Sequence, residues 1–226
     1  MFDVCIIQEA CIFSEEMNIT KVLCAEVSGV AYHEKWNVLC LRGYINEENY
    51  KDLFSIHLMD NVQVDMQSVG GELPTAIRIT EHLENYDYDI HVNGVCASAC
   101  AQFIFLGASE KYIYRDGAVV MHGGPMARHQ YQEGRTPEQV QSIDRQMDEF
   151  RKFYEVRGIN IDLTRTPPAD VAKQLSEGKV VFWQPSIEQF IEYGVGRIHY
   201  DIYHPNVSVH LKNIQDQGRK DASSPD

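Results

Sequence analysis

The sequence is short of basic residues. It has 20 lysines and arginines against 33 aspartates and glutamates, so its formal net charge is −13 over 226 residues. A surface this acidic repels phosphate backbones and anionic lipid head groups. The densest basic run, Arg219-Lys220, is followed at once by Asp221. The charge balance therefore predicts no nucleic-acid partner.

Long apolar runs are also missing. No stretch reaches the roughly 18 apolar residues that a membrane-spanning helix needs, so we expect no membrane span. The N-terminal segment carries Asp3 where a secretory signal has positive charge, and Glu9 interrupts the next apolar stretch. These features predict a cytoplasmic protein, or an exported one if a signal peptide has been removed.

Two ligand-binding motifs are absent as well. No Cys-x-x-Cys pair occurs, which disfavours a zinc site, and we expect neither a metal nor a cofactor. A chain of this length does not need disulfide staples, so free thiols are expected for the six cysteines: Cys5, Cys11, Cys24, Cys40, Cys96 and Cys100. No Gly-x-x-x-x-Gly-Lys-Ser/Thr loop is present, so any ATP-driven step would require a separate ATPase partner.

From Trp36 onward, short apolar runs alternate with amphipathic stretches. Expected strands cover residues 37–41, 62–66, 89–94, 111–114, 118–121 and 180–183, and expected helices cover 47–54, 73–86, 97–106, 139–156, 169–175 and 186–193. Strands separated by helices imply crossover connections, and hence an α/β protein with a mainly parallel sheet flanked by helices. We divide the chain into an N-terminal region that forms one or two strands, including Lys21–Cys24, or an irregular cap (1–35), one domain (36–211) and a disordered tail (212–226).

Three segments could carry chemistry. Ser98 follows a strand and begins a helix of small residues, where backbone N–H groups can hold an oxyanion. Gly70-Gly71 follows a buried strand and allows close approach of a ligand to the backbone. His122 ends a strand at the sheet edge where ligands gather in α/β proteins. Taken singly, the three fit a helix cap, a plain turn and a structural histidine, but the combination is far more specific.

Together these segments resemble the Clp protease proteolytic subunit and its relatives in the Clp/crotonase superfamily, over roughly residues 37–198. Ser68–Gly71 stands where that family has a Ser-Pro-Gly-Gly turn, and Cys96–Cys100 where it has its nucleophile. His122 follows Ser98 by 24 residues, a spacing typical of the family, and Pro185–Val195 is similar to its closing helix. The Cys-Ala-Ser-Ala-Cys form resembles a divergent Clp-like branch. The fold implied is one of repeated β-β-α units.

The resemblance implies a serine endopeptidase-like hydrolase that acts on a peptide or protein substrate and assembles as a homo-oligomer. Ser98 would attack the carbonyl, with His122 as its general base. Backbone N–H groups of Ala99 and of either Gly70 or Gly71 would hold the oxyanion. Cys96 and Cys100 would flank the nucleophile as packed small residues, and no disulfide is expected between them across one helical turn.

The third member of the triad departs from the family pattern. Residues 181–184, where an acid is expected, read Val-Phe-Trp-Gln. Asp170, 48 residues after His122, is the first candidate if residues 176–179 are an insertion, and Asp162 is the second. A Ser–His dyad oriented by a carbonyl or amide is the alternative. His129 and Tyr131 fall where Clp-like relatives have a substrate-binding arm, although a solvated loop explains both residues.

Two other functions remain open from the sequence. A crotonase-like enzyme acting on acyl-CoA would use the same oxyanion glycines, but no basic cluster for the CoA phosphates is evident. A catalytically weak or inactive Clp-like subunit would keep the fold, and the missing acid favours it.

Overall fold

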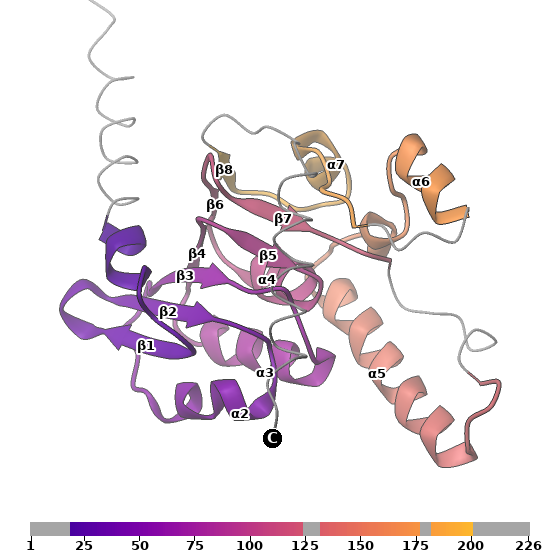
Figure 1. The fold of residues 1–226 in the computed structure, drawn as a ribbon, viewed down its shortest axis with the longest axis horizontal. Coiled ribbons are helices and arrows are strands. Elements are labelled where there is room, and N and C mark those ends of the chain that lie inside the picture. Colours follow the sequence, from indigo (N-terminus) through magenta and orange to yellow (C-terminus); the bar gives the residue numbers. More distant parts are fainter. Residues whose placement is uncertain (1–18, 124–131, 177–181, 201–226) are drawn as a thin grey trace, which may run out of the picture.

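The computed structural model describes residues 19–123, 132–176 and 182–200, whose strands form two sheets (Figure 1). The larger sheet has the order β1-β2-β3-β4-β6-β8, and the smaller one pairs β5 with β7. The strands are β1 (Val30–His33), β2 (Val38–Arg42), β3 (Gln63–Gln67), β4 (Asp89–Val92), β5 (Val95–Ala97), β6 (Lys111–Ile113), β7 (Ala118–Val120) and β8 (Ile198–Tyr200). Among the strands of the described residues, only β1 runs antiparallel to its neighbour.

The helices flank the sheet (Figure 1) and lie between β2 and β3, β3 and β4, β5 and β6, and β7 and β8. They are α2 (Glu47–Tyr50), α3 (Leu73–Glu84), α4 (Phe105–Gly107), α5 (Pro137–Val156), α6 (Ala169–Ser176) and α7 (Ile187–Glu192). Short 3₁₀ turns cover Glu34–Trp36, Lys51–Ser55 and Ile161–Thr164, and a π-helical segment, Cys100–Ile104, leads into α4. The predicted α/β fold with a mainly parallel sheet is confirmed. No helix of the described residues is long and apolar enough to cross a bilayer.

Local sequence explains where α2, α5 and α7 begin. Thr136 and Ser186 cap α5 and α7, and each forms a capping box with the glutamine three residues later. In such a box the two side chains satisfy backbone N–H groups that the helix itself leaves without partners. Asn46 caps α2 in a similar way, by accepting from the Asn49 N–H at 2.8 Å. The expected helices at 47–54, 139–156 and 186–193 therefore start within about two residues of their predicted positions.

The core lies on one face of the larger sheet, against α3 and the segment that leads into α4. Fully buried aliphatic side chains project from the central strands, namely Leu39, Leu41, Val64, Met66, Ile90 and Val92. The helical side is contributed by Ala76, Ile79 and Leu83 of α3 together with Phe103 and Phe105. Of these strands, β2 is a continuous apolar run (Val38–Leu41), which is typical of strands in a parallel sheet, whereas β3 and β4 alternate apolar with polar residues.

The opposite face of the larger sheet carries buried polar groups. Asp65 has no exposed surface and forms an ion pair with Arg42, and its other oxygen accepts from Asn93 at 2.7 Å. Burial raises the pKa of Asp65, while the adjacent guanidinium acts to lower it. His91 is also buried, and burial lowers its pKa to about 4. Specific pairing of polar groups therefore stabilises this face, next to a small apolar cluster of Cys24, Val38 and Cys40.

The smaller sheet joins the larger one through Ser68, just beyond the end of β3. The Ser68 N–H donates to the Val95 carbonyl at 2.7 Å, and the Ala97 N–H donates to the Ser68 carbonyl at 2.9 Å. In β5 and β7, Ala97 lies opposite Val120 in a parallel register. The ends of β3, β5 and β7 therefore meet, and each of the three segments singled out in the sequence follows one of these ends.

Two expectations about the N-terminal region and the cysteines are wrong. Residues 19–24, which include the expected strand Lys21–Cys24, are helical, because Thr20 and Cys24 are buried one turn apart. Cys24 forms a disulfide with Cys40 of β2, so these two thiols are not free. Cys5, Cys11, His129, Tyr131, part of the expected strand at 180–183 and the tail at 212–226 lie outside the described residues.

Candidate active site

Ser98 occupies a sharp turn between β5 and the helical segment that begins at Ala99. Its backbone φ of 54° lies in the left-handed region, which non-glycine residues rarely adopt. The Ser98 N–H donates to the Val120 carbonyl at 2.9 Å, and its own carbonyl accepts from the Gln102 N–H at 2.8 Å. A strand-to-helix turn of this kind exposes a serine hydroxyl above a sheet, as in the nucleophile elbow of many hydrolases.

His122 stands two residues beyond Val120, at the end of β7. Its Nε2 lies 2.5 Å from the Ser98 hydroxyl oxygen. Met121 exchanges two backbone hydrogen bonds with Trp183, and the Phe182 ring packs edge-on against the imidazole at 5.1 Å between centroids. Partial desolvation lowers the pKa of His122 below its ordinary value. The imidazole is therefore neutral, and able to accept a proton, over a wider range of pH.

Gly70 and Gly71 lie beside the serine turn, both with positive φ (98° and 154°). A Cβ on Gly70 would lie 2.5 Å from the Ser98 Cβ, so only glycine fits at this position next to Ser98. The Gly70 N–H donates to the Ser68 hydroxyl at 3.0 Å. Gly71, in contrast, lines the cavity that Ser98 and Ala99 also border. The structure thus distinguishes two glycines that the sequence left equivalent.

The cavity has a volume of about 330 Å³ and two kinds of wall. Its polar lining consists of Ser98, His122 and Gln102. Its apolar lining consists of Leu73 from α3, Phe103 from the π-helical segment, and Met147 and Phe150 from α5. Among the described residues, no lysine or arginine lines it. The cavity suits an apolar group whose reacting atom lies at Ser98.

The acid that would orient His122 is not identified by the structure. Within the part of the chain that is described, no carboxylate forms a hydrogen bond or ion pair with this imidazole, and desolvation alone accounts for its pKa shift. Asp162 lies exposed in the 3₁₀ turn Ile161–Thr164. Asp170 lies in α6, but its side chain is outside the described part. The position of Asp170 in the triad therefore stays a prediction.

The sequence did not reveal the role of Gln102. This buried side chain donates from Nε2 to the Gly123 carbonyl at 2.6 Å, and so ties the helix after Ser98 to the residue after His122. Gln102 lies four residues beyond Ser98, the spacing of residues that share one face of a helix. A polar residue at this spacing, within a segment of small and apolar residues, is the sequence signal that could have indicated its role.

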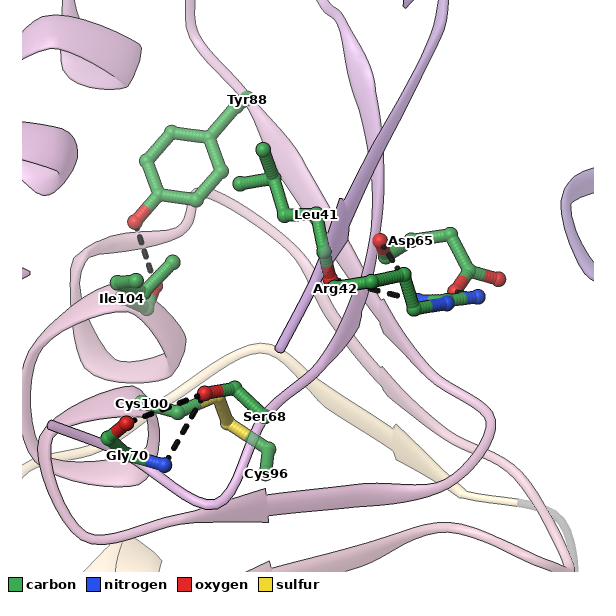
Figure 2. Close-up of a disulfide and its surroundings, with 9 residues drawn as sticks. All are labelled: Leu41, Arg42, Asp65, Ser68, Gly70, Tyr88, Cys96, Cys100 and Ile104. Atoms are coloured by element: carbon green, nitrogen blue, oxygen red, sulfur yellow. Dashed lines mark hydrogen bonds and ion pairs between the residues drawn. A yellow bond between two sulfur atoms is a disulfide. The ribbon is translucent and has the colours of Figure 1, made fainter. Parts of the chain in front are cut away.

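The expectation that Cys96 and Cys100 do not bond to each other is wrong. They form a disulfide, with Cα atoms 5.2 Å apart (Figure 2). Cys96 belongs to β5, whereas Cys100 lies in the helical segment beyond Ser98. The two residues are therefore not separated by a regular helical turn, and the bend between strand and helix brings them within bonding range.

Comparison with known proteins adds little to this description. No family model matches the chain, and no curated protein matches it. Among solved structures, a mutant of ClpP1 from Listeria monocytogenes is similar, with 18% identity and a TM-score of 0.48, covering 74% of this chain and 92% of that one. A likeness of this extent supports no statement about activity. The functional assignment therefore depends on the geometry around Ser98.

Proposed function

We propose that this protein is a serine hydrolase that cleaves peptide bonds through an acyl-enzyme formed at Ser98. The observation that carries the proposal is the 2.5 Å contact between the Ser98 hydroxyl and His122 Nε2, on a left-handed turn that opens into a cavity. A nucleophile hydrogen-bonded to a neutral base is the arrangement that acyl transfer requires. The apolar wall of the cavity favours a substrate with an apolar side chain next to the cleaved bond.

In the proposed mechanism, the Ser98 oxygen bonds to the substrate carbonyl carbon while its proton passes to His122 Nε2. The negative charge that develops on the carbonyl oxygen is stabilised by backbone N–H groups. We assign these donors to Ala99 and Gly71, because the Gly70 N–H is engaged with Ser68. His122 then gives its proton to the leaving amine, and water, activated by the same imidazole, releases the acyl group.

An inactive Clp-like subunit is the second candidate, since no acid contacts His122 among the described residues. The crotonase-like alternative receives less support, because none of the described residues that line the cavity is a cation for the CoA phosphates. A homo-oligomer and a separate ATPase partner are kept as parts of the proposal that derive from the sequence. For the location, the two disulfides favour the exported alternative over the cytoplasmic one.

Reaction with a fluorophosphonate probe tests the proposal. We expect mass spectrometry of the digested wild-type protein to show the adduct on Ser98, and no adduct in Ser98→Ala. The control variant is Ser186→Ala, which removes another serine at a helix start, the cap of α7, and should label like the wild type. A wild-type protein that takes up no probe at Ser98 would rule out the hydrolase.

The rate of this labelling should depend on pH through His122. The base must be neutral to accept the proton, so the rate rises with pH and reaches a plateau above the pKa of His122. Because desolvation lowers this pKa, the midpoint should fall below the usual histidine value of about 6.5. A pH–rate profile of labelling measures it. A midpoint above that value would contradict the expected environment of the imidazole.

Replacing Gln102 with leucine should slow labelling by about tenfold, the effect of losing a hydrogen bond worth about 1.4 kcal/mol. The variant loses the donor to the Gly123 carbonyl, which holds the chain just after His122. Because the side chain positions His122 and also lines the cavity, the maximal inactivation rate should fall by a larger factor than the probe's binding constant changes. Gln189→Leu, which removes a bond in the α7 capping box, is the matched control. Equal rates in both variants would exclude a positioning role.

A further inference from the structure

The disulfide between Cys96 and Cys100 encloses Ser98. One sulfur comes from the last strand before the serine and the other from the first turn of helix after it. Both cysteines are completely buried, and Ser68 and Gly70 lie beside them (Figure 2). The chain between the two cysteines consists of Ala97, Ser98 and Ala99 alone. The crosslink therefore spans the bend that presents the serine hydroxyl.

That bend adopts a conformation that the backbone does not favour by itself. Ser98 has a φ of 54°, and a non-glycine residue persists in this region only where its surroundings impose it. The helix that follows begins with the π-helical segment Cys100–Ile104 instead of a regular α-helical turn. A constraint at this point has a direct effect on where the serine hydroxyl stands relative to His122.

We propose that the Cys96–Cys100 disulfide is a positioning element that holds Ser98 in its reactive conformation, so that full reactivity requires the oxidised form. The inference rests on the proposed serine hydrolase function. Reduction by a dithiol breaks the S–S bond, gives two Cys thiols and leaves the dithiol as its own cyclic disulfide, a transfer of two electrons and two protons. Ser98 would then be free to leave the left-handed conformation.

The second disulfide offers a contrast that separates positioning from general stabilisation. Cys24 and Cys40 are 16 residues apart, whereas Cys96 and Cys100 are only four apart. In the chain-entropy model, a crosslink restricts the unfolded chain more when it closes a longer loop. The Cys24–Cys40 bond also belongs to a separate cluster with Val38, away from the cavity. It should contribute more to stability, and the Cys96–Cys100 bond more to the geometry of the serine.

The experiment compares Cys96→Ala/Cys100→Ala with Cys24→Ala/Cys40→Ala in phosphonate labelling at 25 °C. We expect the first variant to lose at least tenfold in maximal inactivation rate, with the probe's binding constant changed less than twofold. The second variant should melt at a lower temperature than the wild type but label at the wild-type rate. Dithiothreitol should slow labelling of the Cys24→Ala/Cys40→Ala variant, and reoxidation should restore it. Reduction breaks the Cys96–Cys100 bond without replacing any residue near Ser98, so a slower rate cannot result from a substitution there.

Hydrogen exchange of the amides of residues 97–102 gives a readout that does not need activity. Exchange should be faster in Cys96→Ala/Cys100→Ala, or in reduced protein if that variant does not fold. Equal labelling in the reduced and oxidised states would overturn the inference and leave the hydrolase intact. If neither the oxidised nor the reduced protein is labelled, the hydrolase proposal fails. Hydrogen exchange then decides whether the disulfide positions Ser98. Unchanged exchange would overturn the positioning role, and faster exchange would support it.

Discussion

Replacing His122 with glutamine should slow phosphonate labelling of Ser98 by about 10³-fold, within the range that general-base catalysis contributes. Glutamine keeps a polar side chain of similar size near the hydroxyl but cannot take up its proton. His122 Nε2 lies 2.5 Å from the Ser98 oxygen, and within the described residues no second histidine contacts this serine. The attack would then depend on the small fraction of Ser98 that ionises without assistance.

Labelling kinetics of His122→Gln measure this effect, and His199→Gln is the matched control. His199 is an exposed histidine of β8 that contacts Glu110 at 2.8 Å, and it is not among the residues that line the cavity. The control should react at the wild-type rate. A His122→Gln variant that keeps the wild-type rate would show that another group takes the proton, and would contradict the proposed dyad.

Replacing Arg42 with methionine should lower the free energy of unfolding by about 3–5 kcal/mol, the usual cost of removing one partner of a buried ion pair. Asp65 has no exposed surface, and only 13% of the Arg42 side chain is exposed. Without the guanidinium, the carboxylate keeps the Asn93 amide but loses the opposite charge that offsets its desolvation. Protonation of Asp65 would remove the unpaired buried charge, so part of the variant protein should remain folded.

Urea denaturation at several pH values measures this effect and its sign. Burial already raises the folded-state pKa of Asp65, so this group's contribution to stability falls as pH rises through that pKa. Removing Arg42 raises the pKa further, so the loss should be largest near neutral pH and should shrink as the pH falls. Arg151→Met, which breaks an exposed pair with Asp148, should cost about 1 kcal/mol or less. A loss that is independent of pH would contradict the role assigned to Asp65.

The strands and their parallel arrangement could be predicted because the pattern is local. Runs such as Val38–Leu41 are apolar on both faces, which indicates burial between two layers. The polar face of the sheet could not be predicted, because its partners come from distant positions. Asp65 pairs with Arg42 and Asn93 across three strands, and each side chain by itself looks like an ordinary surface residue.

The serine–histidine contact could be predicted, but the disulfide that holds the serine turn could not. Motif order indicated Ser98, His122 and the glycine turn, and the structure brings all of these together. The disulfide escaped the sequence because a spacing of four residues suggests one helix, whereas the chain changes from strand to helix between Cys96 and Cys100. Such a change of backbone conformation at a single residue leaves no periodicity to detect.

The pairing of Ala97 with Val120 has a consequence for how the length of this chain can vary. Ser98 is the first residue after one paired position and His122 the second after the other, so the register of β5 and β7 brings the two side chains together. Extra residues in the exposed turn at Arg115 and Asp116 would leave that register intact and change only the count between serine and histidine. One extra residue inside β7 would turn the imidazole to the opposite face of the strand. The interval of 24 residues is therefore incidental, and proteins with the same chemistry can carry a different one.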